Sequence, residues 1–135
     1  MWHVVTYFHG GRSGLHVGDR ILPPAVTGAP AMADSLPAGH ELESAATRVT
    51  DRSKVYLTDT ADLARFFAAL HPCGDRKRGG DVYRVVPDGP VEDDPDYHGE
   101  PGRSVRCGSA VIVGIVATGV GRAKYVRAAQ AAGIA

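Results

Sequence analysis

The residue types with the clearest chemical potential occur in three short stretches. His9-Gly10-Gly11 pairs an imidazole that can bond a ribose hydroxyl with glycines whose backbone can closely approach a flat ligand. Tyr56 lies among β-branched and apolar residues and can stack on a heteroaromatic ring. Each stretch also has an ordinary structural interpretation, because a histidine in a glycine turn and a tyrosine on a strand are common.

The third stretch is an acidic cluster at residues 92–96, Glu92-Asp93-Asp94-Pro95-Asp96. Clustered carboxylates can hold a divalent cation, but the spacing lacks the alternate positions of a calcium loop. One carboxylate can instead face a positive charge that develops at a sugar carbon as a bond breaks. A solvated acidic loop is the structural alternative.

Length and charge restrict the class of protein. The chain has 135 residues, which predicts one domain spanning 1–135. Lys and Arg number 15, as do Asp and Glu, so the surplus of positive charge typical of nucleic-acid binding is missing. The most apolar run, 110–120, is too short to cross a bilayer, and the first residues lack a secretory pattern. We therefore expect a cytoplasmic protein with no membrane or nucleic-acid partner.

Metal and phosphate-loop motifs are missing from the sequence. The candidate zinc ligands His71, Cys73, His98 and Cys107 fit no paired-ligand spacing. The 119–121 stretch, Gly-Val-Gly, lacks the third glycine of a dinucleotide fingerprint, and no Gly-Lys-Ser/Thr occurs. We expect no metal site.

Strands and two helices are expected to position these residues. Strands are predicted at 4–8, 54–58, 81–86 and 110–117, the last buried on both sides, with a hairpin or short strand within 15–22. The clearest helix follows a cap at Asp59 or Thr60 and stops at His71-Pro72. Its apolar face consists of Leu63, Phe66, Phe67 and Leu70. A second helix is predicted at 122–132, and the few helices favour an α+β fold.

Taken in order, the segments resemble the rifampin ADP-ribosyltransferase family. The matching motifs are Tyr7-Phe8-His9-Gly10, Leu15-x-Val17-Gly18-Asp19, Val55-Tyr56-Leu57-Thr58, Val82-Tyr83-x-Val85, Pro87-x-Gly89-Pro90-Val91-Glu92-Asp93-Asp94-Pro95, Gly99-x-Pro101-x-Arg103-Ser104-x-Arg106 and Val113-Gly114. The Gly-Pro-Val-Glu-Asp-Asp-Pro stretch and the later Arg-Ser-x-Arg are the specific parts. The resemblance covers His9 to about Val116.

The resemblance implies a fold and an activity. The fold is the split β-sheet of mono-ADP-ribosyltransferases with few flanking helices, which binds NAD as co-substrate in the cleft between two sheets. The activity is that of a glycosyltransferase, which transfers ADP-ribose from NAD to an acceptor and releases nicotinamide. The acceptor is a small molecule such as a rifamycin, which implies antibiotic resistance, or a macromolecule.

The resemblance also implies catalytic roles for His9, Tyr56 and Asp94. His9 would bond a ribose hydroxyl while Gly10 backbone groups clamp the nicotinamide amide. Tyr56 would stack on the nicotinamide ring, and Asp94 would stabilise the cation formed as nicotinamide leaves. Pro95 restricts Asp94 to an extended conformation, so Asp93 would point the opposite way. The residues that we expect to bind NAD are His9, Gly10, Gly11, Tyr56, Thr58, Arg103 and Ser104.

The chain departs from the family pattern around the expected acceptor side. Gly11 stands where threonine is usual, and the polar, glycine- and proline-rich stretch 23–52 is longer than the family's and lacks its Ser-Asn element. The acceptor is therefore left open. An RNA 2′-phosphotransferase-like enzyme that uses NAD is one alternative, against which the zero net charge argues. A degenerate NAD-binding module is the other, and the intact His9, Tyr56 and Asp94 weigh against it.

Overall fold

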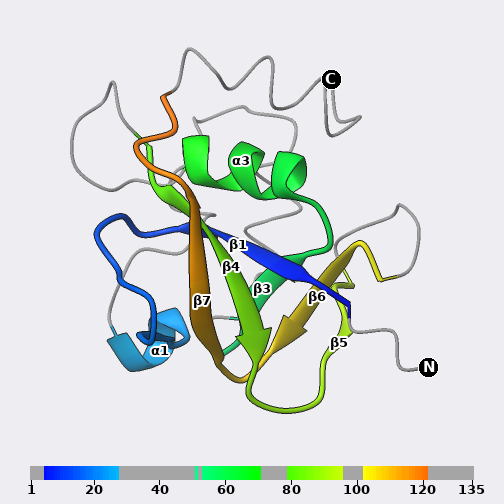
Figure 1. Ribbon diagram of the computed structural model, residues 1–135. Helices are drawn as coiled ribbons and strands as arrows, with labels where there is room; N and C mark the ends of the chain where they lie inside the picture. Colours follow the sequence, from blue (N-terminus) through cyan, green and yellow to red (C-terminus); the bar gives the residue numbers. More distant parts are fainter. Residues whose placement is uncertain (1–4, 28–50, 52, 71–78, 96–101, 122–135) are drawn as a thin grey trace.

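The computed structural model describes residues 5–27, 51, 53–70, 79–95 and 102–121. Within these ranges the chain forms a seven-stranded sheet in the order β2-β7-β4-β1-β3-β6-β5, in which every pairing is antiparallel (Figure 1). The strands are β1 (Tyr7–Gly11), β2 (Arg20–Ile21), β3 (Val55–Thr58), β4 (Asp81–Pro87), β5 (Glu92–Asp93), β6 (Ser104–Cys107) and β7 (Ala110–Ala117). The helices are α1 (Pro24–Thr27) and α3 (Ala61–Leu70). This architecture confirms the predicted α+β class.

The junction between β1 and β3 divides the sheet into two halves. β1 pairs with β4 along its whole length, from Tyr7↔Val85 to Gly11↔Asp81. On its other side, within the described residues, β1 meets β3 at one register pair, Phe8↔Thr58. The half β2-β7-β4-β1 and the half β3-β6-β5 are therefore joined over a short distance only. Whether this is the split sheet expected from the resemblance stays a prediction.

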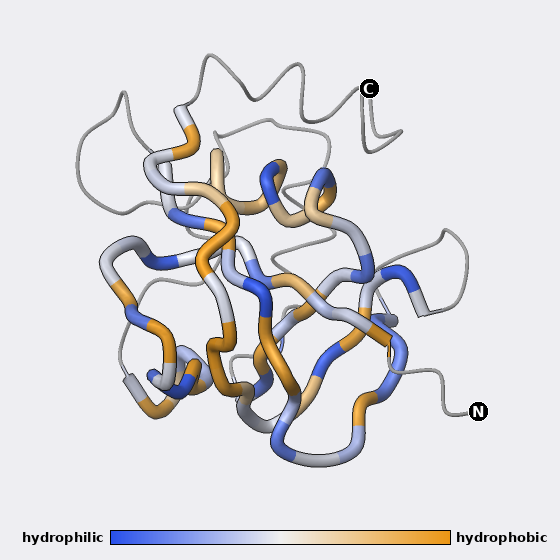
Figure 2. Tube along the Cα trace, in the orientation of Figure 1, coloured by the Kyte–Doolittle hydropathy of each residue, from blue (hydrophilic) through white to orange (hydrophobic). Residues whose placement is uncertain are grey.

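Two apolar clusters lie on the two faces of the sheet. The larger contains Ile21, Val55, Leu57, Tyr83, Val85, Val105, Cys107, Ala110 and Ile112. The smaller lies beneath α3 and contains Ala64, Ala68, Ala69, Val82 and Val120, with Phe8 and Ala117 packed against it. Apolar stretches follow β4 and β7 in the hydropathy trace (Figure 2). Side chains alternate between the faces along each strand, so the cluster to which a residue belongs identifies its face.

Helix α3 confirms the predicted amphipathic helix and its cap. The Thr60 hydroxyl accepts a hydrogen bond from the Leu63 amide at 3.2 Å, which makes Thr60 the capping residue. Leu63 and Phe66 are buried as predicted, whereas Phe67 is only partly buried. The face nearest the sheet is formed by alanines, which the apolar pattern of large residues did not single out.

The first predicted strand differs from the observed one. The sequence predicts a strand at 4–8 that runs into a glycine turn, but β1 extends through Gly10 and Gly11. A Cβ on Gly10 would lie 1.9 Å from the backbone oxygen of Ala64 in α3. The missing side chain therefore serves close packing of a helix on a strand rather than a turn.

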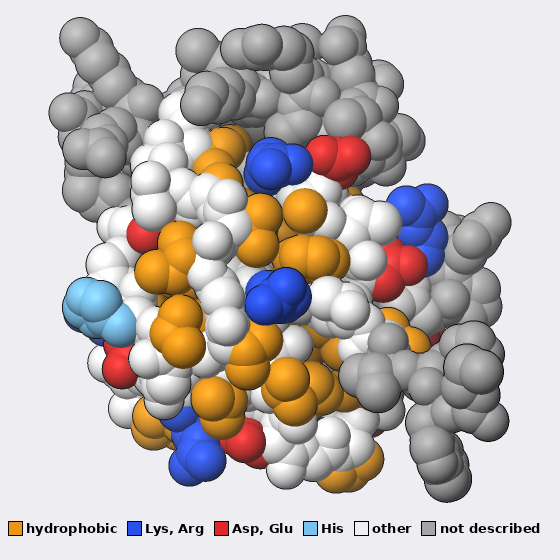
Figure 3. All heavy atoms as spheres, in the orientation of Figure 1, with side chains coloured by type: hydrophobic (Ala, Val, Ile, Leu, Met, Phe, Trp, Pro, Cys, Tyr) orange, Lys and Arg blue, Asp and Glu red, His pale blue; other side chains and the backbone are white. Residues whose placement is uncertain are grey.

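The prediction that β7 is buried on both sides is wrong. Ala110 and Ile112 are buried, but Val113 is 40% exposed and Ile115 is 47% exposed. One side of β7 packs on the larger cluster and the other is open, and register shifts in its pairing with β4 break strict alternation. Hydrophobic side chains accordingly gather on the surface over β4 and β7 (Figure 3).

Several expectations fall outside the described residues. These are the helix at 122–132, the zinc candidates His71, Cys73 and His98, and the stretch 23–52 apart from its first residues and Asp51. The segment 15–22 contains the two-residue strand β2. Among the described helices, none has the length and apolar character needed to span a membrane.

Candidate active site

His9 lies at the junction of the two half-sheets. Its Nδ1 is 2.8 Å from the backbone oxygen of Tyr56 in β3. Because a carbonyl oxygen can only accept, this bond requires the proton on Nδ1 and leaves Nε2 as an acceptor. Continued pairing beyond Phe8↔Thr58 would set Gly10 opposite Tyr56, but the described pairing ends before it. The imidazole therefore bridges the two strands at the point where their ladder stops.

The surroundings of His9 favour a neutral imidazole. Burial lowers the pKa of His9 below its ordinary value of 6.5, and the hydrogen bond to Tyr56 opposes this only in part. The ring also lies above Gly11: a Cβ at that position would be 2.5 Å from Nε2. Gly11, which has no side chain, leaves the space that the ring occupies.

Tyr56 belongs to a row of polar side chains on the face of the sheet that carries α3. Its neighbours along β3, Val55 and Leu57, enter the larger core cluster, so Tyr56 projects from the opposite face. Arg106 on β6 is its register partner, and Glu92 on β5 is in turn the partner of Arg106. The row thus crosses three adjacent strands.

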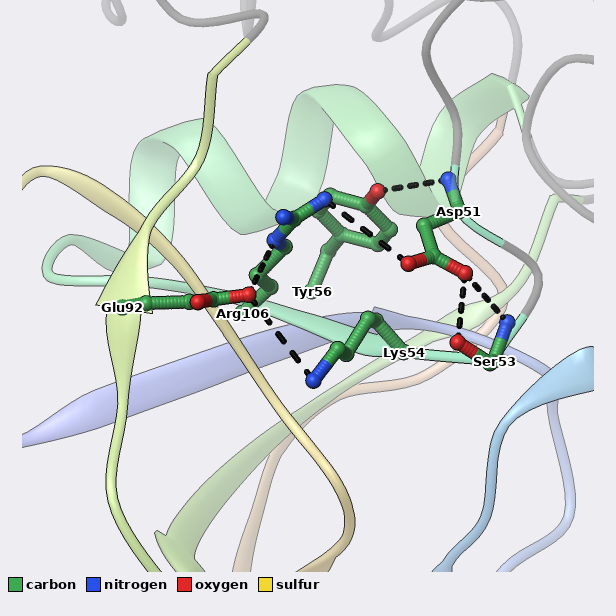
Figure 4. A network of polar contacts seen from close by, with 6 residues as sticks. All are labelled: Asp51, Ser53, Lys54, Tyr56, Glu92 and Arg106. Atoms are coloured by element: carbon green, nitrogen blue, oxygen red, sulfur yellow. Dashed lines mark hydrogen bonds and ion pairs between the residues drawn. The ribbon is translucent and has the colours of Figure 1, made fainter.

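The Tyr56 hydroxyl is tied to this row (Figure 4). It accepts a hydrogen bond from the Asp51 amide at 2.8 Å. Burial raises the pKa of Tyr56, and the nearby Asp94 carboxylate raises it further, whereas the Asp51 amide and Arg106 lower it. Tyr56 therefore lies within electrostatic reach of both a cation and the predicted catalytic carboxylate.

The adjacent carboxylates of Asp93 and Asp94 have different partners. Asp94 Oδ2 accepts a hydrogen bond from the Ser104 hydroxyl at 2.9 Å, and Asp93 Oδ1 accepts one from the Gly102 amide at 3.0 Å. Ser104 is the register partner of Thr58, two residues along β3 from Tyr56, so Asp94 is bound on the same face as Tyr56. Asp93 instead ties the segment that precedes β6.

The other predicted NAD-binding residues have structural contacts. The buried Thr58 hydroxyl donates to the Thr60 carbonyl at 2.8 Å. Arg103 Nε lies 3.6 Å from Asp59 Oδ1. Gly10 is held against α3 by the close packing described above.

The structure thus joins the predicted residues by two routes. His9 reaches Tyr56 through the backbone carbonyl, and alternation along β1 places its side chain on the face opposite to Phe8 and Gly10. Asp94 approaches Tyr56 on the α3 face. The His9 and Tyr56 side chains therefore project from opposite faces and come together only at the β1–β3 junction.

Sequence reasoning did not assign a role to Arg106, Glu92 or Asp51. Arg106 occurs in the Arg-Ser-x-Arg motif and Glu92 in the acidic cluster, so both were visible as polar residues in specific motifs. Their link to Tyr56 depends on the strand register, which no local pattern contains.

As to metals, no three His, Cys, Asp or Glu side chains converge within the described part of the chain.

The fold and the site define an α+β protein in which a polar row on β3, β6 and β5 adjoins the His9–Tyr56 bond between two antiparallel half-sheets. A family model described as rifampin ADP-ribosyl transferase matches residues 7–118 of the 135-residue chain. The chain therefore belongs to the rifampin ADP-ribosyl transferase family, which confirms the resemblance read from its motifs. A search of curated proteins finds no significant match.

Proposed function

We propose that the protein transfers ADP-ribose from NAD to an acceptor and releases nicotinamide. The family match supports ADP-ribosyl transfer. The observation that carries the proposal is the hydrogen bond between His9 Nδ1 and the Tyr56 carbonyl at the end of the β1–β3 ladder. This bond brings His9 next to Tyr56, and Asp94 lies near Tyr56 on the α3 face, which supports NAD binding at this part of the sheet.

The residues fit the parts of NAD that they are expected to meet. A neutral His9 with its proton on Nδ1 presents Nε2 as an acceptor for a ribose hydroxyl. The described β1–β3 pairing stops at Phe8↔Thr58, which leaves backbone groups of Gly10 without a β3 partner in that ladder and so able to meet the nicotinamide amide. The Tyr56 ring supplies an aromatic face for nicotinamide.

Asp94 supplies the electrostatic part of the proposed chemistry. As the bond between nicotinamide and ribose breaks, positive charge develops on the sugar, and a fixed carboxylate nearby stabilises it. Ser104 holds Asp94 through its hydroxyl, so the carboxylate is oriented before the charge appears. These steps need no metal ligand. A rifamycin is the acceptor named by the family, and we propose it as the first acceptor to test.

Calorimetry with NAD in the presence of EDTA tests the donor. We expect saturable binding and a rise in Tm with NAD concentration, because a ligand of the folded state alone stabilises it. Absence of both binding heat and thermal stabilisation would contradict the proposal. Adenosine diphosphate ribose, which lacks nicotinamide, serves as the matched ligand. The Tyr56→Ala substitution should change the Kd for this ligand less than it changes the Kd for NAD.

A further inference from the structure

Arg106 occupies the middle of the polar row on β3, β6 and β5. Register pairs Tyr56 with Arg106, and Arg106 with Glu92. Residues directly opposite in antiparallel strands share a face and have Cβ atoms about 5 Å apart. The sequence neighbours of Arg106, Val105 and Cys107, are core residues, so its side chain must leave from the face that carries the Tyr56 ring.

The guanidinium of Arg106 is held from several directions (Figure 4). Its Nε lies 2.6 Å from Glu92 Oε1, and one terminal nitrogen lies 3.9 Å from Asp51 Oδ2. The Tyr56 side chain, on the register partner of Arg106, and the Glu92 carboxylate both raise the pKa of Arg106. Lys54 Nζ lies 3.8 Å from the same Glu92 oxygen. The Arg106 side chain is only 20% exposed, so these contacts are partly shielded from water.

The Tyr56 hydroxyl is held by Asp51, a residue that Arg106 also approaches. Asp51 donates its amide to the hydroxyl, and its carboxylate accepts from the Ser53 amide at 2.9 Å, which holds that segment in a tight turn. Arg106, the register partner of Tyr56 on β6, lies 3.9 Å from the carboxylate of the same Asp51. Because the hydroxyl oxygen lies on the axis of the second side-chain torsion, holding it restricts the first torsion only. Rotation of the ring plane about that axis is restricted by neighbouring side chains, of which Arg106 is the register partner on β6.

We propose that Arg106 is a positioning residue that holds the Tyr56 ring in the orientation that stacks on the nicotinamide ring. This inference rests on the function proposed above. The role needs a planar fork, because the guanidinium meets Glu92 and Asp51 through different nitrogens while it lies on the register partner of Tyr56. A lysine ammonium on a flexible stem cannot reproduce that geometry.

A double-mutant cycle on NAD affinity tests the inference. Arg106→Met should raise the Kd for NAD by about five- to tenfold, the range expected for a misaligned aromatic stack. In the Tyr56→Ala background the same substitution should have no further effect, because Arg106 acts through the ring. The Kd of Arg106→Lys for NAD should be closer to that of Arg106→Met than to that of the unaltered protein. Additive losses, or full rescue by lysine, would overturn the inference.

A matched control uses another arginine in a surface ion pair. Arg65 lies 3.1 Å from Asp62 on α3 and belongs neither to the row nor to the residues expected to bind NAD, so Arg65→Met should leave the Kd for NAD unchanged. An equal loss of affinity in this variant would show that removing surface charge, rather than ring positioning, weakens binding. That outcome also counts against the inference.

An arm without NAD separates failure of the inference from failure of the proposed function. Urea unfolding of Tyr56→Phe, Arg106→Met and the double variant should reveal coupling between the hydroxyl and the guanidinium. Independent effects on unfolding overturn the inference even if NAD binds. Clear coupling together with an unchanged Kd for NAD in Tyr56→Ala contradicts the proposed function instead, and the positioning role falls with it.

Discussion

The Nδ1 atom of His9 lies 2.8 Å from the carbonyl oxygen of Tyr56, although the two residues are 47 positions apart in the chain. The bond joins β1 to β3 just beyond the register pair Phe8↔Thr58, where the described ladder between these strands ends. A side chain thus takes over from backbone pairing at the junction of the half-sheets. Its protonation state should therefore affect both the fold and the proposed chemistry.

The stability of the protein should depend on pH through His9. Burial lowers the pKa of His9 in the folded protein below 6.5, so the unfolded chain binds this proton at a higher pH than the folded protein does. The stabilising contribution is present above about pH 6.5 and is lost as pH falls through the lowered pKa. His9→Asn keeps an amide donor and does not titrate. The difference in free energy of unfolding between the two proteins, from urea unfolding at several pH values, should shrink with acidification; a constant difference contradicts this.

Gly11→Ala should impair function more than stability. The added Cβ would lie 2.5 Å from His9 Nε2, the end of a side chain that can turn away. We expect loss of the His9–Tyr56 bond and about tenfold weaker turnover, the scale of one hydrogen bond. Gly89→Ala is the control, since nothing lies within 4 Å of a Cβ there. Turnover equal to the control would show that the ring position is unimportant.

Gly10→Ala should behave in the opposite way. Its Cβ would lie 1.9 Å from the backbone oxygen of Ala64 and 2.8 Å from the backbone nitrogen of Ala68, so α3 itself must shift. Overpacking of this kind costs about 1–3 kcal/mol or more. Urea unfolding should show that loss directly. A variant as stable as the unaltered protein would mean that α3 does not rest on β1 in solution.

Asp94 and Asp93 should differ in their effects on turnover. Asp94→Ala should lower the rate by about 10²–10³, equivalent to roughly 3–4 kcal/mol of transition-state stabilisation, with a much smaller change in NAD affinity. Asp93→Ala should leave most activity and lower Tm slightly, because it removes the acceptor of the Gly102 amide. Turnover and Tm of both variants decide the matter. If Asp93→Ala is folded but inactive, Asp93 and not Asp94 carries the catalytic role, which contradicts the prediction.

Local patterns predicted the elements that local physics determines. Helix α3 followed from its apolar spacing and the Thr60 cap, and β3 and β4 followed from their β-branched residues. Two errors arose where tertiary packing decides. Gly10 resembled a turn residue but permits contact with α3, and the continuous apolar run of β7 did not reveal that one side faces outward.

The candidate site was predictable where a motif carried it and not where register did. His9, Tyr56 and Asp94 are predicted from resemblance to the family, and alternation beside Pro95 predicts that Asp93 and Asp94 point in different directions, as their separate partners Gly102 and Ser104 indicate. Arg106 was recognised only as part of the Arg-Ser-x-Arg motif, without a role of its own. Its position opposite Tyr56 depends on the pairing of β3 with β6, which brings together residues 50 positions apart. No local sequence pattern shows which residues of two such strands face each other.

Release of nicotinamide tests the central claim most directly. The protein is incubated with rifampin and NAD labelled in both the nicotinamide and the adenylate halves, beside a matched Asp94→Ala sample. We expect free nicotinamide to form in step with rifampin carrying the adenylate label, and both to fall by about 10²–10³ in the variant. Nicotinamide release without labelled rifampin would contradict the acceptor alone. No nicotinamide release from a folded protein would contradict the account.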